Sequence, residues 1–333
     1  MAIAPAPIAE IRRGPFIESI HCGHAVICDA SGGVIAAWGD PEAVVLPRSS
    51  AKMIQALPLI TSGAADRFGL TDAQLALACA SHQGATLHTD AVTRWLGDLG
   101  LDDDALRCGP EVSRDPEVAR TMIREGAEPC QVHNNCSGKH AGFLTLNRHL
   151  GGEAEYINPD HPVQVACRAA TEDVTQEDSP GYGIDGCSAP NFATTMHGMA
   201  RAMAYFASAH SRGDSQSAAA TRLVQAMYAH PVLVAGEGRA CTRLMRAVTE
   251  PVALKTGAEG FFVAILPERQ IGIAVKAADG ATRAAECAIA ALLVRLGAAQ
   301  AGHPDVAAFL TPVLRNRRDI AVGEIRPAPG LLS

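Results

Sequence analysis

Apolar and polar residues alternate in short segments near both ends of the chain. Residues 21–28 alternate and are rich in β-forming side chains, and residues 34–38 continue the pattern after a glycine-containing turn. The same arrangement returns at residues 261–266 and 271–276, and residues 320–326 could add a last short strand. Alternation with a period of two, bounded by turn residues, is typical of β-hairpins. The sequence therefore predicts strands at both ends.

The middle of the chain has the spacing of amphipathic helices instead, with apolar residues three or four positions apart. Strands near both ends with helices between them do not make a doubly wound parallel sheet, because that fold alternates strand and helix throughout. We therefore predict an α+β fold: a mainly antiparallel sheet built from both chain ends, packed with helices and an inserted helical region. The expected helices are 49–62, 72–81, 89–98, 115–125, 139–149, 161–175, 192–210, 215–229, 237–248 and 281–296.

Length and composition indicate a folded protein with a sizeable core. The chain has 333 residues, of which 48% are hydrophobic and 19% charged, which excludes a disordered or coiled-coil chain. We expect residues 1–333 to form one catalytic unit, with the sheet from about 15–45 and 250–327 and the helical region over about 49–248. The net charge of −7 argues against a dedicated nucleic-acid-binding protein.

Ten cysteines occur with no CxxC pair and no regular framework. In a chain of this size, that usage indicates a reducing compartment rather than a disulfide scaffold. The first residues do not read as a signal peptide, and no run of 18 apolar residues occurs. We expect a cytoplasmic protein without a membrane segment.

A serine and a lysine stand three residues apart at the start of the first expected helix. Ser49 and Lys52 would share one helix face, and a lysine of lowered pKa can activate a serine hydroxyl. The alternative is that Ser49 caps the helix and Lys52 is solvated. The SxxK pattern alone does not decide between them.

Two further segments carry polar groups suited to catalysis. Lys255–Gly257 follows a β-like segment, where glycine allows a substrate close to the backbone. SxxK followed by KTG is the arrangement of serine β-lactamases and penicillin-binding proteins. Ser81 ends an apolar stretch and could carry a second proton, although an ordinary helix end with Gly84 as its cap is the alternative.

Two glycine-rich loops each contain a cysteine beside other donors. Cys136 lies next to Lys139 and His140, and Cys187 follows Asp185 by two positions. If these loops meet, the two thiols could hold a soft divalent metal such as zinc. Buried small side chains are the alternative explanation for both cysteines. From the residues alone, His140 is a more natural ligand than Lys139.

Five segments together resemble a known family. In order, they are RSSAK at 48–52, CASHQG at 79–84, NNCSGKHAG at 134–142, GIDGCSAPN at 183–191 and KTG at 255–257. They are similar to the bacterial class 3 L-asparaginases of the rhizobial type, and VGEIRP at 322–327 also fits. The resemblance extends over roughly residues 15–327.

The resemblance implies hydrolysis of L-asparagine to L-aspartate and ammonia by a homodimer with a β-lactamase-like fold. It implies two Ser–Lys tandems, a zinc ion that supports substrate binding rather than attack, and several substrate contacts. By position, the tandems are Ser49–Lys52 and Ser81–Lys255, the zinc ligands are Cys136, Lys139 and Cys187, and the substrate contacts are Arg48, His140 and Asp185.

The mechanism expected on this basis begins with Ser49, which attacks the side-chain amide carbon while Lys52 acts as general base. Ser81 and Lys255 relay a proton toward the leaving ammonia, and Asp185 binds the α-ammonium group. Glutaminase is a close alternative, because one methylene in a pocket is worth only about 1–3 kcal/mol. A β-lactamase or penicillin-binding protein is another alternative, and a non-catalytic zinc or metabolite sensor is a third.

Overall fold

The computed structural model describes residues 3–332, which divide into two compact units. We call the first the sheet unit, because it contains both ends of the chain, and the second the helical unit. The sheet unit comprises Met1–Ser50, Thr194–Ser208 and Ala240–Ser333, and the helical unit comprises Ala51–Ala193 and Ala209–Arg239. Within residues 3–332, no helix is both long and apolar enough to cross a membrane.

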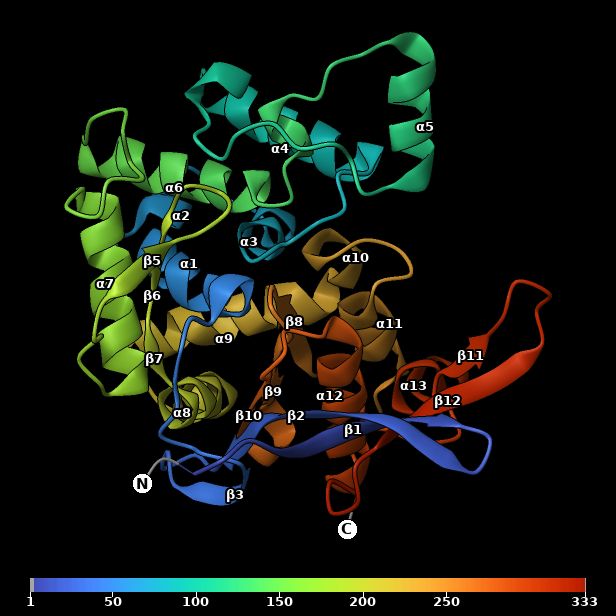
Figure 1. Ribbon diagram of the computed structural model, residues 1–333. Helices are drawn as coiled ribbons and strands as arrows, with labels where there is room; N and C mark the ends of the chain where they lie inside the picture. The colour runs from blue at the N-terminus through green and yellow to red at the C-terminus, as the bar shows by residue number, and fades with distance from the viewer. Residues whose placement is uncertain (1–2, 333) are drawn as a thin grey trace. The chain divides into compact units, whose positions relative to one another are not determined.

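An eight-stranded antiparallel sheet forms the centre of the sheet unit (Figure 1). Its order is β11-β12-β1-β2-β10-β9-β8, and β3 also pairs with β2, so strands from the two chain ends lie side by side. The prediction of an antiparallel sheet built from both ends is therefore confirmed. The strands are β1 (Ala6–Arg13), β2 (Phe16–Cys28), β3 (Val34–Trp38), β8 (Ala253–Gly257), β9 (Phe261–Leu266), β10 (Ile271–Ala277), β11 (Val313–Arg315) and β12 (Ala321–Pro327).

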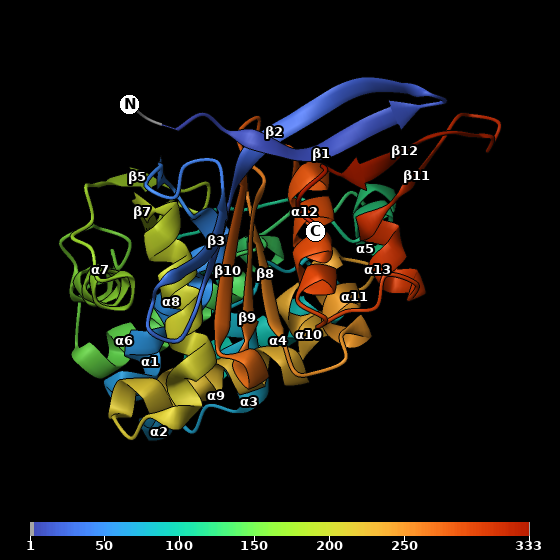
Figure 2. The same ribbon diagram turned by 90° about the horizontal axis from the view of Figure 1, so that it is seen from below.

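Helices cover both faces of the central strands. Every residue of β9 is buried, which requires a layer on each side of the sheet. The helix α8 (Met196–Ser208) packs on β10 and β2, and α12 (Thr282–Arg295) packs on β1, β9 and β10 (Figure 2). Gly272 of β10 is needed for this contact, since a Cβ there would lie 2.0 Å from the backbone nitrogen of Ala204 in α8. The unit also contains α11 (Ala240–Ala247), α13 (Pro304–Leu310), β4 (Val44–Val45) and β7 (Thr194–Thr195).

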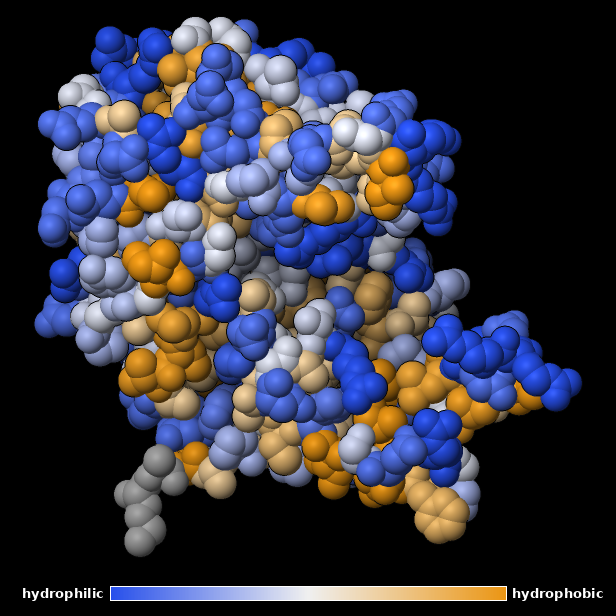
Figure 3. All heavy atoms as spheres, turned by 45° about the horizontal axis from the view of Figure 1, so that its top comes forward, coloured by the Kyte–Doolittle hydropathy of each residue, from blue (hydrophilic) through white to orange (hydrophobic). Residues whose placement is uncertain are grey.

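Helices cover less of the sheet at the β1–β2 turn and near β11 and β12. Phe16 at the β1–β2 turn is 73% exposed, and Ile17, Ile20, Val313 and Ile320 are exposed near it along the chain and on the neighbouring strands. Figure 3 shows apolar side chains on the surface at the lower right, in the part of the molecule formed by these strands. Exposed apolar clusters of this kind are typical of contact surfaces.

The helical unit packs around one apolar helix. The helix α1 (Lys52–Thr61) has eight buried residues and contacts α6, α7 and α9. Gly138 lets α6 approach α3 closely, since a Cβ there would lie 2.4 Å from the Leu77 carbonyl oxygen. The remaining elements are α2 (Ala64–Arg67), α3 (Asp72–Ala78), α4 (Thr86–Asp98), α5 (Pro116–Glu125), α6 (Ser137–Leu150), α7 (Pro162–Thr175), β5 (Tyr182–Ile184), β6 (Pro190–Phe192), α9 (Ser215–Ala229) and α10 (Pro231–Val234).

Several expected boundaries are wrong. The sheet begins at Ala6 rather than near residue 15, and Val44–Val45 pairs with β7 outside the main sheet. The expected helix 49–62 is a 3₁₀ turn at Arg48–Ala51 followed by α1, and the expected helix 72–81 ends at Ala78. Whether the two units act as the single catalytic unit expected from the sequence stays a prediction.

Candidate active site

Ser49 lies in the 3₁₀ turn that leads into α1, and Lys52 is the first residue of that helix. The N-cap residue is Ala51, which makes no side-chain capping bond, so the alternative that Ser49 caps the helix is wrong. The Ser50 hydroxyl donates to the Pro47 carbonyl at 2.6 Å and fixes the turn. Arg48 has a φ of 53°, a left-handed conformation that is strained for a residue with a side chain.

Lys52 is buried, with 1% of its surface exposed, so the solvated alternative is also wrong. Its Nζ donates to the carbonyl oxygen of Ala80, the residue before Ser81. The same Nζ donates to the sulfur of Cys136 at 3.1 Å. Lys52 is thus hydrogen-bonded to the backbone next to Ser81, the second predicted serine, and to Cys136, a predicted metal ligand.

The three predicted zinc ligands converge in the helical unit. Cys136 immediately precedes α6, Lys139 lies in the first turn of α6, and Cys187 lies in the turn between β5 and β6. Lys139 Nζ donates to Cys187 Sγ at 2.9 Å, and the thiols of Cys136 and Cys187 are hydrogen-bonded to each other. All three side chains are buried.

The short turn around Cys187 explains how this thiol is presented. The amide of Asp185 donates to the carbonyl of Ala189 at 2.9 Å, and the amide of Ser188 donates back to Asp185 at 2.9 Å. Ser188 adopts a φ of 68°, which closes the turn. Asp185 is half-buried, and its charge acts on both Lys139 and Cys187.

Cys136, Lys139 and Cys187 shift the pKa values of one another. The hydrogen bond from Cys136 and the charge of Lys139 lower the pKa of Cys187 against the effect of burial. Burial by itself would favour the neutral amine of Lys139, but the sulfurs of Cys187 and Cys136 outweigh burial and raise its pKa. The hydrogen bond with Cys187 and burial raise the pKa of Cys136. Without a metal, the cluster is therefore a buried thiolate–ammonium pair.

The donor set is chemically suited to zinc. Thiolates and a neutral amine are soft or borderline ligands, and they come from two segments that the fold already holds together. Binding would require Lys139 and Cys136 to release their protons. Within residues 3–332, no group of three or more His, Cys, Asp and Glu side chains is arranged to hold a metal, so any site here depends on the lysine.

His140, the other candidate zinc ligand on α6, uses one ring nitrogen for a contact with a tyrosine. Its Nδ1 lies 2.8 Å from the hydroxyl of Tyr156, and its Nε2 is buried without a hydrogen-bond partner within residues 3–332. Burial and the nearby Lys139 lower the pKa of His140, so the ring is neutral. Among the two candidate ligands on α6, the structure thus places Lys139 against a cysteine and His140 against a tyrosine.

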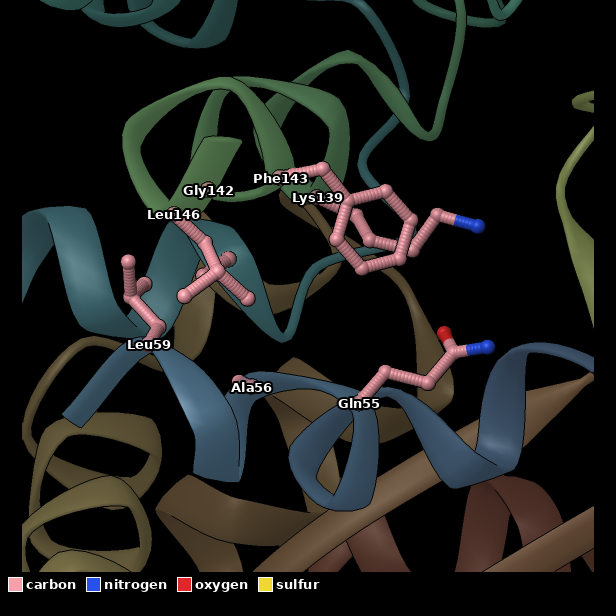
Figure 4. Close-up of a pocket in the computed structure, with 8 residues that line it drawn as sticks. Gln55, Ala56, Leu59, Lys139, Gly142, Phe143 and Leu146 are labelled. Carbon is pink, nitrogen blue, oxygen red and sulfur yellow. The ribbon is translucent and has the colours of Figure 1, made fainter. Parts of the chain in front are cut away.

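A small pocket borders the cluster on its apolar side. Figure 4 shows Lys139 beside Phe143 on α6, above Gln55 of α1. Lys139 Nζ lies 5.2 Å from the centre of the Phe143 ring, within the range of a cation–π contact. The cavity holds about 10 Å³ of space for a solvent molecule, which is room for a water but not for an amino acid.

The KTG segment lies beside the Ser49 turn inside the sheet unit. Lys255–Gly257 forms part of the edge strand β8, and a Cβ on Gly257 would lie 2.8 Å from the Pro47 carbonyl oxygen and 3.1 Å from the Ser50 nitrogen. A glycine is therefore required where the strand passes the serine turn. The Thr256 amide donates to the sulfur of Cys241 at 3.2 Å, and this hydrogen bond connects β8 to α11.

Ser81 and Lys255 belong to different units. Ser81 is half-buried in the loop after α3, where its backbone amide donates to Val234 at 2.9 Å. Lys255 is buried in β8, and its Nζ donates to the carbonyl oxygen of Thr256 at 2.7 Å. Their pairing as a second tandem stays a prediction.

Sequence reasoning did not identify two residues that support the cluster. Glu111 accepts hydrogen bonds from the backbone and side-chain amides of Asn135, at 3.0 and 2.9 Å, so the carbonyl oxygen of Asn135 faces Cys136 at 3.0 Å. Tyr156 holds His140 as described above. Both come from loops without a recognisable motif, and only their contacts reveal them.

Comparison with known proteins places the chain in a family. The model for L-asparaginase II matches residues 9–327. Among curated proteins, none matches this chain.

Solved structures give only distant likenesses. Mglu in its native form is 14% identical, covers 79% of this chain and has a TM-score of 0.42, and this chain spans 61% of the Mglu chain. A putative β-lactamase from Bacteroides dorei DSM 17855 is 13% identical, with 77% of this chain and 84% of that chain covered and a TM-score of 0.41. The octameric penicillin-binding protein homologue from Pyrococcus abyssi is 12% identical, with 84% and 75% covered and a TM-score of 0.37.

The family match extends over nearly the whole sequence and agrees with the resemblance indicated by the five motif segments. This chain therefore belongs to the L-asparaginase II family.

Proposed function

We propose that this protein hydrolyses the side-chain amide of L-asparagine to L-aspartate and ammonia. The observation that carries the proposal is the buried Lys52, which directly follows the Ser49 turn and is bonded to Cys136, in a chain of the L-asparaginase II family. A buried amine three residues from a serine is the kind of base that a hydroxyl nucleophile needs.

Hydrogen bonding around Lys52 supports its role as a general base. A neutral amine has two N–H bonds and one lone pair. The carbonyl of Ala80 and the sulfur of Cys136 accept those two N–H bonds, which leaves the lone pair for the hydroxyl proton of Ser49. Ser49 then attacks the amide carbon, and water later hydrolyses the aspartyl ester.

The second tandem completes the proton transfers in this proposal. Ser81, with Lys255, passes a proton to the leaving ammonia. The Ala80 carbonyl bonded to Lys52 couples the backbone next to Ser81 to the first tandem. Arg48, His140 and Asp185 contact the substrate, and Asp185 takes the α-ammonium group because it is the half-buried carboxylate beside the cluster.

We further propose that Cys136, Lys139 and Cys187 hold a zinc ion. When bound, zinc supplies positive charge that attracts a negatively charged group of the substrate. The short contact of Lys139 with Cys187 supports the site, because both groups already lie within one cluster. Asn135, fixed by Glu111, orients Cys136 from outside the cluster.

We also propose that the protein is a cytoplasmic homodimer. The ten cysteines include no CxxC pair and no regular framework, which supports a reducing compartment. The exposed apolar residues around Phe16 support a contact surface between copies. Light scattering after size-exclusion chromatography tests the dimer, and a monomer at micromolar concentration contradicts it.

Ammonia release from L-asparagine tests the proposed reaction. Ser49→Ala should lower kcat more than about 1,000-fold, and Lys52→Ala about 100- to 10,000-fold. Ser62→Ala is the matched control, since Ser62 is exposed at the other end of α1. Near-wild-type kcat in Ser49→Ala or Lys52→Ala overturns the assignment.

The same assay separates the alternatives. L-glutamine replaces L-asparagine in one arm, and each arm is run with a chelator and with added zinc. Preference for L-glutamine makes the protein a glutaminase, and hydrolysis of a chromogenic β-lactam without amide hydrolysis makes it a β-lactamase. Stoichiometric zinc with no amide hydrolysis favours a sensor.

A further inference from the structure

The hydroxyl of Tyr156 lies between a backbone amide and a histidine ring. The amide N–H of Arg107 donates to this hydroxyl at 2.9 Å, and Nδ1 of His140 lies 2.8 Å from it on the other side. Tyr156 and His140 are both fully buried. The backbone carbonyl of Tyr156 accepts from Gln164 at 2.9 Å, which fixes the tyrosine in place.

Counting donors determines where the proton of His140 lies. A phenol has one O–H to donate, and within residues 3–332 the only acceptor that this O–H meets is Nδ1 of His140. If Nδ1 carried a proton, two donors would face the Tyr156 oxygen and its own O–H would be buried without an acceptor, which is unfavourable. Nδ1 therefore accepts, and the ring proton lies on Nε2.

The protonated nitrogen is the one without a partner. Within residues 3–332, Nε2 of His140 has no acceptor, although the residue is completely buried. Its ring is held on two sides by edge contacts with Phe143 and Tyr156, each with ring centres 5.6 Å apart. His140 directly follows Lys139 in the first turn of α6, so it borders the candidate site. A rigid, buried donor beside a ligand-binding cluster is suited to a ligand acceptor.

We propose that Tyr156 is a positioning residue: its hydroxyl fixes His140 in the Nε2–H form, so that His140 donates a hydrogen bond to an oxygen of the bound amino acid. The ligand identity in this inference rests on the proposed function. A carboxylate oxygen fits, because a charged acceptor forms a stronger hydrogen bond with an N–H donor than a neutral acceptor does. A nitrogen that carries a proton has no lone pair for a metal, so His140 acts on the ligand and not as a zinc ligand through Nε2.

The first experiment locates the proton without any turnover. In ¹⁵N-histidine-labelled protein, the imidazole ¹⁵N shifts distinguish a protonated from an unprotonated nitrogen, and His140→Gln identifies the His140 signals by their loss. We expect the proton on Nε2 in the wild type and a Nδ1–H population in Tyr156→Phe. A proton on Nδ1 in the wild type, or an unchanged spectrum in Tyr156→Phe, overturns the proposal.

The second experiment measures binding of L-aspartate by calorimetry and the steady-state constants for L-asparagine. Loss of one aligned hydrogen bond in Tyr156→Phe should raise Kd and KM roughly 3- to 10-fold and change kcat less than about 2-fold. Tyr228→Phe, on α9, is the matched control and should change neither constant. A lower kcat with unchanged KM and Kd overturns the proposal.

A pair of variants at His140 keeps the proposal testable if Tyr156→Phe does not fold. His140→Gln retains an N–H donor near the position of Nε2, whereas His140→Leu retains none. We expect L-aspartate to bind at least about 3-fold more tightly to His140→Gln than to His140→Leu. Equal affinities overturn the proposal. If the wild type releases no ammonia from L-asparagine, the proposed reaction is wrong, while the ¹⁵N spectra still decide the position of the proton.

Discussion

The strand β9 of the sheet unit and the first turn of α6 in the helical unit bury different kinds of side chain. In β9, which lies between β10 and the edge strand β8, six consecutive apolar residues are fully buried. In the first turn of α6, Ser137, Lys139 and His140 are also buried, although all three are polar. The free energy of burial stabilises the first region, whereas the second pays a desolvation cost that only specific partners offset.

The buried polar turn of α6 has a rigid support. The helix α6 is anchored by close backbone packing on α3 at Gly138, and this anchoring lets it hold polar groups in fixed positions. Ser137 illustrates the pairing, since its hydroxyl donates to Val132 at 2.9 Å and lies 2.9 Å from the Nε2 of His82. In the first turn of α6, the described contacts give Ser137 and Lys139 hydrogen-bond partners, whereas Nε2 of His140 has none.

The largest expected effect comes from breaking the buried pair of Lys139 and Cys187. Cys187→Ala leaves the Lys139 ammonium buried without its main partner, and should lower the free energy of unfolding by about 3 kcal/mol in the presence of a chelator. Denaturant unfolding followed by circular dichroism measures the change.

The double variant Lys139→Met/Cys187→Ala is the decisive companion. Replacing both partners with apolar side chains removes the unpaired charge, so it should recover more than half of the lost stability. If the double variant is less stable than Cys187→Ala alone, the unpaired Lys139 ammonium is not the cause of the stability loss in Cys187→Ala. Both variants should also lose bound zinc, which metal analysis of the purified protein measures.

The sequence predicted the sheet unit better than the helical unit. Apolar burial can be read from a pattern of residues, whereas the burial of a polar group depends on partners that are distant in the sequence. The strands β3 and β9 lie at the positions expected, because an apolar run between turns has only one stable environment. The strand β1 was missed because it contains a proline, and a register shift between Pro7 and Ala9 accommodates this residue in the sheet. The helix α3 ends three residues early, where the Ala80 carbonyl accepts from Lys52 instead of continuing the helix.

Of the candidate site, the sequence could indicate the two cysteines but not the side chains around them. A cysteine in a glycine-rich polar loop is a candidate metal ligand by its residue type alone. The side chains of Cys136 and Cys187 lie within hydrogen-bond distance of each other. Tyr156 and Glu111 could not be predicted, because a tyrosine or a glutamate in a loop has many uses and only a tertiary contact selects one. The preference for Lys139 over His140 likewise depends on which side chain reaches Cys187.

A smaller effect is expected from a change inside the sheet unit. Gly272→Ala places a Cβ 2.0 Å from the backbone nitrogen of Ala204 and 2.4 Å from the carbonyl oxygen of Ala200, so α8 must shift away from β10. We expect the free energy of unfolding to fall by roughly 2–3 kcal/mol. Gly97→Ala is the matched control, because a Cβ there meets nothing within 4 Å and alanine favours a helix. An equally large loss in Gly97→Ala would show that glycine replacement itself, and not the contact with α8, is responsible.

The smallest expected effect concerns the helix α5, at the edge of the helical unit. The Asp115 carboxylate accepts from the amides of Glu117 and Val118, both at 3.1 Å, and caps the first turn. Asp115→Ala should lower the free energy of unfolding by about 1 kcal/mol, and Asp90→Ala, exposed on α4, should leave it nearly unchanged. Because α5 contributes no side chain to the Lys139 cluster, zinc content in Asp115→Ala should equal that of the wild type. A loss of zinc from this variant would mean that the polar cluster depends on the whole helical unit, and not on the anchored turn of α6 alone.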